Sequence, residues 1–291
     1  MAPEESWEVS ITDPSPALRE TVTALAEQVG ASDGVSPLNE QAGRILAGQL
    51  DGLHLVATED GAVVGYAQVD PADRSAQLFV VPGARRRGIG RALAELASHQ
   101  AEGLEWWSFG TLPGARALAG RMGLEPVRGL LKMSRDTSAT PTDDPGPAPA
   151  GITMGTFSDA DVDDLVAVNA LAFADHPEQG QMSRRDVEDK VAESWFDPRG
   201  VLLARDEEGR LVGFHWTKVV GDVGEVYVIG VHPFEHGRGL GRYLLSSGLA
   251  HLVNERGVRE VVLYVEAANE RVVQMYEKAG FVEVNRDTRW R

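Results

Sequence analysis

Two stretches of the chain share one pattern of apolar and polar positions. Residues 53–69 read LHLVATEDGAVVGYAQV, and residues 201–219 read VLLARDEEGRLVGFHWTKV. An apolar run, a short acidic turn with glycine and a second apolar run predict a β-hairpin. We therefore expect one hairpin in each half of the chain.

A strand, a glycine-rich loop and a helix follow each predicted hairpin. The two segments are LFVVPGARRRGIGRALAELA at residues 78–97 and VYVIGVHPFEHGRGLGRYLL at residues 226–245. In each, a valine-rich run leads into the loop, and apolar residues then recur at helical spacing. These apolar residues are Leu93, Leu96 and Ala97 in the first half and Leu245, Leu249, Leu252 and Val253 in the second.

The repetition continues to the end of each half. Residues 260–266 (EVVLYVE) predict a buried strand, and residues 269–280 predict a helix that a glycine ends. The sequences MGL, ending at Leu124, and AGF, ending at Phe281, occupy corresponding places in the two halves. The pattern indicates an internal duplication, in which each copy is an α/β domain (α+β mixed sheet).

A linker separates the copies. Residues 136–151 read DTSATPTDDPGPAPAG, which is rich in proline and small polar residues and offers nothing to bury. We therefore divide the chain into an N-terminal domain at residues 1–135, the linker at 136–151 and a C-terminal domain at 152–291. A chain of 291 residues is long enough for two domains that each bury a core.

Composition limits the partners of these domains. Hydrophobic residues make up 43% of the chain and charged residues 25%, as in soluble globular proteins. A net charge of −16 would repel nucleic acid and anionic membrane surfaces, so we expect neither as a partner. An anionic ligand would need a local positive site, for which Arg85, Arg86 and Arg87 are candidates.

Cysteine is absent, which excludes a disulfide framework and a thiol nucleophile. The first residues have no basic segment with an apolar core as in a secretion signal, and no apolar run approaches the length of a membrane span. We expect a cytoplasmic monomer that uses no metal.

The glycine loops predict a site for an anion. Backbone N–H groups at the start of a helix have no partner within the helix, and the helix dipole favours negative charge there. The alternative is a tight strand-to-helix turn without a ligand. A dinucleotide-binding loop fits less well, because Leu93 and Leu244 stand where Gly-x-Gly-x-x-Gly needs its last glycine.

One family combines these features. Arg85-x-x-Gly88-x-Gly90 after a strand ending in Val-x-Pro, together with LYVEAANERVVQMYEKAGF at residues 263–281, resembles the GCN5-related N-acetyltransferase superfamily. The resemblance covers both halves and implies that each loop holds the pyrophosphate of acetyl-CoA. His236 departs from the pattern, because arginine or glutamine is usual at its position.

Acetyl transfer to an amine needs a group that accepts a proton, and a group that protonates the leaving thiolate helps. Counting back from the loops pairs Glu225 with Arg74, and counting back from the final glycine pairs Tyr276 with Ala119. The C-terminal copy thus has a carboxylate and a phenol that the N-terminal copy lacks. We expect Glu225 to be the general base and Tyr276 the general acid. A solvated strand-edge carboxylate and a core aromatic are the alternatives.

Three further segments of the C-terminal half resemble one subgroup of this superfamily. Residues 172–180 (AFADHPEQG), 194–200 (SWFDPRG) and 213–219 (GFHWTKV) are similar to tandem-domain acetyltransferases that acetylate the cysteine amine of Cys-GlcN-Ins, an aminosugar–inositol conjugate. This resemblance implies a small-molecule substrate bound by Glu40, Glu178, Lys218, Glu225 and Tyr264.

The resemblance also implies which residues contact acetyl-CoA. Strand backbone can pair with the amides of the pantetheine arm, and loop amides can hold the diphosphate. We expect the N-terminal copy to bind acetyl-CoA without turning it over. The implied residues are Ile229, Gly230, Val231, His236, Gly237, Arg238, Gly239, Leu240, Gly241, Arg242, Asn269, Glu270, Arg271, Val272, Val273 and Gln274 in the C-terminal copy, and Phe79, Val80, Val81, Arg86, Arg87, Gly88, Ile89, Gly90 and Arg91 in the N-terminal copy.

Two other functions stay open at this point. One is acetylation of a different amine, such as an antibiotic, a polyamine or a peptide N-terminus. The other is a CoA-sensing or scaffold protein without catalysis. The pair Glu225 and Tyr276 separates the enzymes from the binding protein.

Overall fold

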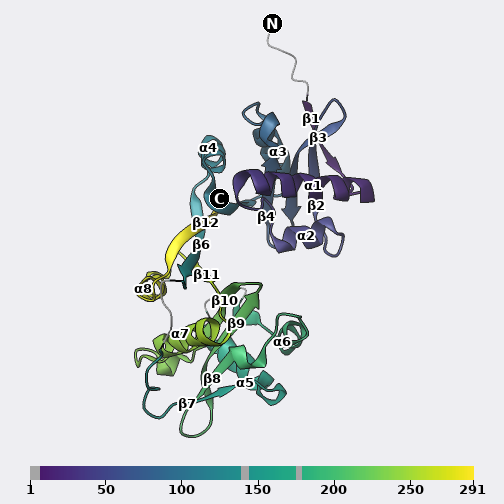
Figure 1. Ribbon diagram of the computed structural model, residues 1–291. Helices are drawn as coiled ribbons and strands as arrows, with labels where there is room; N and C mark the ends of the chain where they lie inside the picture. The colour runs from purple at the N-terminus through teal and green to yellow at the C-terminus, as the bar shows by residue number, and fades with distance from the viewer. Residues whose placement is uncertain (1–6, 139–143, 175–178) are drawn as a thin grey trace. The chain divides into compact units, whose positions relative to one another are not determined.

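The computed structural model describes residues 7–138, 144–174 and 179–291, which form two compact units (Figure 1). Unit 1 comprises Met1–Leu131, Glu266–Ala268 and Asn285–Arg291, and unit 2 comprises Lys132–Val265 and Asn269–Val284. Two short segments of unit 1 therefore come from the half of the sequence that we assigned to the C-terminal domain.

Unit 1 is an α/β unit. Its elements are β1 (Trp7–Thr12), α1 (Pro16–Asp33), α2 (Glu40–Leu46), β2 (Leu53–Glu59), β3 (Ala62–Asp70), β4 (Ser75–Val80), α3 (Ile89–Ser98), β5 (Glu105–Ser108), α4 (Pro113–Met122), the first part of β6 (Pro126–Asp136) and the last part of β12 (Val282–Trp290).

The sheet of unit 1 has the order β1-β2-β3-β4-β5-β12. Neighbours are antiparallel except β4 and β5, which are parallel. Alternation along β3 separates two cores: Ala67 and Val69 pack with α3 on one face, and Tyr66 packs with α1 on the other. Helices therefore cover both faces of this mixed sheet.

Unit 2 repeats the arrangement. Its elements are β7 (Thr153–Thr156), α5 (Val162–Ala172), α6 (Arg184–Val191), β8 (Val201–Arg205), β9 (Leu211–Val220), β10 (Val223–Val231), α7 (Leu240–Ala250), a π-helical turn (His251–Glu255), β11 (Glu260–Glu266) and α8 (Glu270–Lys278), with the last part of β6 and the first part of β12.

The strands β7-β8-β9-β10-β11-β6 are neighbours in that order, and β10 and β11 are parallel. On one face, Phe214 and Trp216 of β9 pack with α5 and α6. On the other face, Ala204 and Val212 pack with α7. The two predicted hairpins are confirmed as β2–β3 and β8–β9, and the buried strand at residues 260–266 is β11.

The last residues of the chain complete unit 1. In β12, Thr288, Arg289 and Trp290 pair with β5. Arg289 also forms ion pairs with Asp73 and with Glu105, a carboxylate that is only 8% exposed. The core of unit 1 thus includes a strand that lies at the far end of the sequence.

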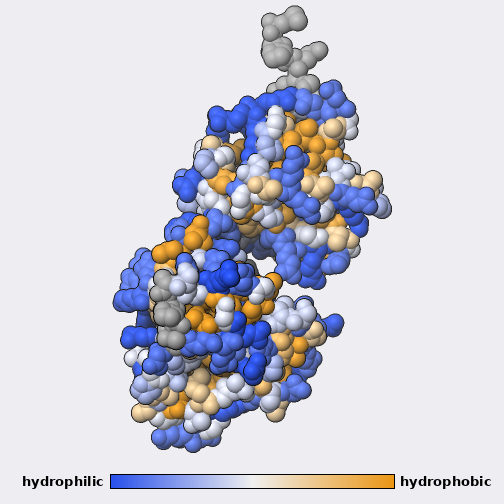
Figure 2. All heavy atoms as spheres, viewed as in Figure 1, coloured by the Kyte–Doolittle hydropathy of each residue, from blue (hydrophilic) through white to orange (hydrophobic). Residues whose placement is uncertain are grey.

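Hydrophilic residues cover much of the visible surface of each unit, and smaller apolar areas are scattered among these residues (Figure 2). Among the described residues, no helix combines the length and apolarity needed to cross a membrane.

Candidate functional site

The glycine loops have the same backbone geometry in both units. Gly88 (φ 92°) is the N-cap of α3, and Gly239 (φ 88°) is the N-cap of α7. Two positions earlier, Arg86 (φ 65°) and Gly237 (φ 80°) are again left-handed. Alternating left-handed residues before a helix turn successive N–H groups toward one side, which makes an anion-binding nest.

His236 makes the hydrogen bond that Arg85 makes in the other loop. The Arg85 Nε donates to the Val80 carbonyl at 2.9 Å, and the His236 Nε2 lies 3.1 Å from the Val231 carbonyl. Each bond ties the loop to the end of the preceding strand. His236 therefore replaces arginine in shaping the loop, provided that its Nε2 carries the proton.

The arginines of the first loop are largely engaged with carboxylates. Arg85 forms a bidentate pair with Asp33 at 2.9 and 2.7 Å, and Arg87 pairs with Glu59. The predicted positive site at residues 85–87 is thus partly neutralised within unit 1. Backbone N–H groups remain the main donors that either loop can offer to a diphosphate.

β10 and β11 separate at the site. Their parallel pairing joins Val223–Val226 to Glu260–Leu263, and within the described residues it does not extend to Val231. The backbone of residues 228–231 pairs with β9, and among the described residues its ladder with β11 is not continued. Gly230 lies in this part, where an added Cβ would come within 2.7 Å of the Phe214 ring. An extended amide-bearing arm could pair with this backbone.

A β-bulge at Tyr227 corrects our alignment of the two copies. Val226 pairs with Thr217 and Val228 with Trp216, so Tyr227 is an extra residue in β10. In unit 1, β4 pairs with β3 without interruption.

The register therefore changes the partner that we assigned to Glu225. Glu225 pairs with Lys218, and Ser75 pairs with Asp70 at the corresponding place. The equivalent of Glu225 is thus Ser75 and not Arg74, because counting along the sequence ignored the bulge. Neither residue is an acid, so unit 1 still lacks this carboxylate.

Glu225 is a half-buried carboxylate, the third residue of β10. Burial raises its pKa, and the charges of Lys218 and Lys132 partly oppose that rise. A carboxylate with a raised pKa is a stronger base than a solvated one.

Lys218 lies against two aromatic rings. Its Nζ is 4.9 Å from the centroid of the Trp195 ring and 5.4 Å from that of Tyr227. The two rings are 5.2 Å apart, and Trp195 also contacts Trp216. Sequence reasoning missed Trp195 and Tyr227. Trp195 is in the segment SWFDPRG, which we quoted only for its resemblance, and Tyr227 is in the strand before the second glycine loop.

Tyr276 lies on α8 and is 4% exposed, packed edge-on against Phe281 at 5.9 Å. Burial raises the pKa of its phenol, so the hydroxyl stays protonated at neutral pH. Its counterpart Ala119 is also buried, on α4. Tyr264 of β11 is 49% exposed, beyond the segment that pairs with β10.

In unit 1, Asp70 and Ser75 stand at the places of Lys218 and Glu225, and an amide network lies next to them on β3 and β4. Gln77 of β4 exchanges hydrogen bonds with Asn39, the N-cap of α2, at 3.0 and 3.1 Å. Across the strand pair, Gln68 donates to the Tyr66 hydroxyl at 3.0 Å, and His54 bonds the same hydroxyl at 2.6 Å. Satisfied amides bind and orient but do not exchange protons near neutral pH.

The remaining predicted residues are in three places. Glu40 is the exposed first residue of α2 in unit 1, and Glu178 is outside the described residues. Asn269 caps α8, where its side chain accepts from the N–H of Val272 at 3.4 Å.

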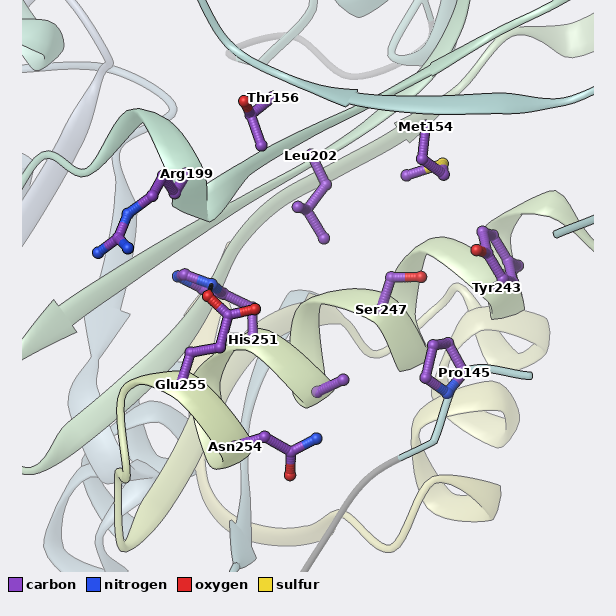
Figure 3. A pocket seen from close by; sticks show the side chains of 11 residues that line it. Pro145, Met154, Thr156, Arg199, Leu202, Tyr243, Ser247, His251, Asn254 and Glu255 are labelled. Carbon is purple, nitrogen blue, oxygen red and sulfur yellow. Dashed lines mark hydrogen bonds and ion pairs between the residues drawn. The ribbon is translucent and has the colours of Figure 1, made fainter. Parts of the chain in front are cut away.

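A separate hollow of about 510 Å³ lies between β7, β8 and α7 (Figure 3). Met154 and Leu202 line one side, and Tyr243, Ser247 and His251 line the other. It contains none of the predicted site residues, and the strand gap beside Glu225 is a different place.

Comparisons with known proteins agree with this geometry. The Acetyltransferase (GNAT) family matches residues 165–281, and an Acetyltransferase (GNAT) domain matches residues 51–123. The chain is 49% identical to a mycothiol acetyltransferase of Propionibacterium freudenreichii subsp. shermanii, over 92% of this chain and 87% of that protein. It is 44% identical to a mycothiol acetyltransferase of Clavibacter michiganensis subsp. michiganensis, over 100% of this chain and 96% of that protein.

Solved structures show the same fold at lower identity. A GCN5-related N-acetyltransferase from Sphaerobacter thermophilus has a TM-score of 0.71 at 22% identity, covering 98% of this chain and 95% of that chain. A tandem GNAT protein from the clavulanic acid biosynthesis pathway has a TM-score of 0.69 at 22% identity, covering 98% and 97%. The predicted tandem acetyltransferase fold is confirmed.

Proposed function

The chain belongs to the mycothiol acetyltransferase family of GCN5-related N-acetyltransferases, and from this membership we propose that it acetylates the cysteine amine of Cys-GlcN-Ins. Acetyl-CoA is the acetyl donor, and the reaction is the last step of mycothiol biosynthesis. The observation that carries the proposal is the place of Glu225, a half-buried carboxylate on β10 just before that strand separates from β11.

Glu225 accepts a proton from the substrate amine, directly or through a water. An α-amino group has a pKa of about 7.7, so its deprotonation near neutral pH costs little. The neutral amine attacks the thioester carbonyl, the C–N bond forms, and collapse of the tetrahedral intermediate breaks the C–S bond. The products are the acetamide and CoA.

Tyr276 protonates the leaving thiolate. The phenol carries its proton at neutral pH, as an unperturbed tyrosine does, and burial raises its pKa further. The acetyl group passes directly from sulfur to nitrogen, which agrees with a sequence that contains no cysteine to carry it.

The N-terminal copy binds acetyl-CoA without catalysis in this proposal. The loop at Gly88 has the nest geometry of the loop at Gly239, whereas Ser75 and Ala119 stand where catalysis needs an acid or base. Native mass spectrometry would then find two CoA molecules per chain. A Gly88→Val variant would bind one and keep its activity.

Product analysis tests the substrate. The full chain is incubated with acetyl-CoA and either Cys-GlcN-Ins, an aminoglycoside, a polyamine or a peptide with a free N-terminus. We expect an acetylated product from Cys-GlcN-Ins at a kcat/KM far above the others. Turnover of another amine with none of Cys-GlcN-Ins would contradict the proposed substrate.

Two variants test the residue roles. Glu225→Gln and Tyr276→Phe should each lower kcat/KM by about 10²–10⁴-fold, the usual contribution of a positioned acid or base. Thermal unfolding verifies that each variant is folded. Full activity of both folded variants would refute the assigned roles, and absence of turnover in the wild type with every amine would favour a CoA-binding protein.

A further inference from the structure

Lys218 and Glu225 are direct neighbours in the sheet but do not form an ion pair. They occupy opposed positions on β9 and β10, so their side chains lie on one face. The ion pairs among the described residues do not include this pair, although the charge of Lys218 acts on Glu225. The ammonium is placed over Trp195 and Tyr227 instead.

The two rings explain why the lysine is held away from the carboxylate. An ammonium over an aromatic face gains about 0.5–2 kcal/mol, more when the site is partly desolvated. Trp195 is fixed by Trp216, a fully buried side chain, and Tyr227 is fixed by the bulge of β10. Both faces are therefore in place before any substrate binds.

We infer that Trp195 and Tyr227 are positioning residues that keep Lys218 from pairing with Glu225, so that the carboxylate can take a proton from the substrate amine. The inference rests on the proposed role of Glu225 as the base. A direct ion pair would favour the charged carboxylate and make it a weaker base. Lys218 keeps its N–H donors next to the base, where they can bind substrate hydroxyl groups.

Among the described residues, Lys132 is the other charged group that acts on Glu225. From β6, Lys132 contributes a second, weaker positive influence on Glu225, and the neighbour on β11 is the apolar Val262. Movement of Lys218 is therefore the change that would alter the basicity of Glu225 most.

The pH dependence of kcat/KM with Cys-GlcN-Ins and acetyl-CoA tests the inference in the full chain. Trp195→Leu removes one ring and releases Lys218 toward Glu225. In this variant we expect the acidic limb of the pH profile, where kcat/KM falls as the pH decreases, to move about one pH unit lower. The reason is that an opposite charge at close range lowers a carboxylate pKa by one unit or more. The plateau should fall roughly threefold, because the base is weaker.

Three matched variants separate positioning from packing. Trp195→Phe keeps a ring and should keep the wild-type limb. Phe196→Leu removes a neighbouring ring that contacts Phe157 and Trp216, and it should lower stability while leaving the limb in place. The double variant Trp195→Leu/Lys218→Met should lose the downward shift, because the cation that causes it is absent.

The outcomes are distinct. An unshifted limb in folded Trp195→Leu, or an equal shift in the double variant, overturns the inference. If Trp195→Leu does not fold, Tyr227→Leu carries the same expectation and the same refutation. An acidic limb that persists in Glu225→Gln would instead refute Glu225 as the base, and with it the proposed function on which this inference rests.

Discussion

At the scale of single residues, Glu225 shows a conflict between activity and stability. Burial raises its pKa above the ordinary value of 4.5. The neutral acid therefore favours folding fully below the ordinary value, and this advantage is lost as the pH rises through the folded-state pKa. At neutral pH the charged carboxylate makes the folded state less stable than an uncharged isostere would.

We predict that Glu225→Gln melts at a higher temperature than the wild type at pH 7–8 and that the difference disappears below about pH 4.5. Calorimetry across this pH range measures it. Glu193→Gln removes the same charge from an exposed residue of unit 2 and should leave the melting temperature nearly unchanged. A lower melting temperature for Glu225→Gln at pH 7–8 would show that burial of Glu225 is not costly.

Residue types indicated the acid and base candidates, but their surroundings could not be read from the sequence. Comparing the copies singled out Glu225 and Tyr276 because each differs from its counterpart. The role of Trp195 depends on a contact with Lys218 between segments joined only by the fold. Residue type alone gives no signal for such a contact.

At the scale of elements, both glycine loops have a left-handed residue two positions before the helix N-cap, but the residue type differs. Arg86 adopts a left-handed φ that glycine adopts at Gly237. For a residue with a Cβ this conformation costs roughly 1–2 kcal/mol, while glycine loses about 0.5–1 kcal/mol more conformational entropy on folding.

We predict that Arg86→Gly increases the free energy of unfolding by about 0.5–1 kcal/mol and that Gly237→Ala decreases it by a similar amount. No atom within 4 Å obstructs a Cβ at Gly237, so backbone strain alone decides the sign there. Urea denaturation of each variant measures both effects. If both substitutions increased the free energy of unfolding, or both decreased it, the assignment of backbone strain to this position would be contradicted.

Hairpins, glycine loops and β11 could be predicted because their signals are local. Alternation, turn residues and helical spacing each involve only a few neighbours in sequence. The bulge at Tyr227 was not predictable, because it is defined by the partner strand β9. One extra residue in β10 was enough to assign Arg74, and not Ser75, as the counterpart of Glu225.

At the scale of the whole molecule, unit 1 is completed by residues from both ends of the chain. Asn285–Arg291 belong to it, and Arg289 and Arg291 both form ion pairs with the buried Glu105. Removing one member of a buried ion pair costs about 3–5 kcal/mol, because the other charge remains buried.

We predict that deleting residues 285–291 destabilises unit 1 by at least about 3 kcal/mol, because it removes both arginines that pair with Glu105. Arg289→Ala should account for only part of the loss, because Arg291 still pairs with Glu105. Calorimetry of the full chain should show one transition moved to lower temperature and the transition of unit 2 nearly unchanged. Arg271→Ala, at an exposed arginine of α8, serves as the control. An unaltered thermogram after the deletion would mean that β12 is dispensable for unit 1.

The sequence predicts a boundary between two domains but not that late segments of the chain belong to unit 1. The linker that composition predicts at residues 136–151 stays a prediction, and it follows the change of unit between Leu131 and Lys132. Composition does not reveal that β12 pairs with β5, since strand pairing over such a separation is a property of the tertiary fold.

The place of β12 also sets the order of events during synthesis. Most of unit 1 precedes unit 2 in synthesis, but the strand beside β5 is made after most of unit 2. At 5–20 residues per second, the 160 residues after Leu131 take roughly 8 to 32 s to translate. During that time the edge of β5 is a nascent, unpaired strand that a chaperone or a second nascent chain can occupy. The sheet of unit 1 can thus gain its β12 strand only after most of unit 2 has been synthesised.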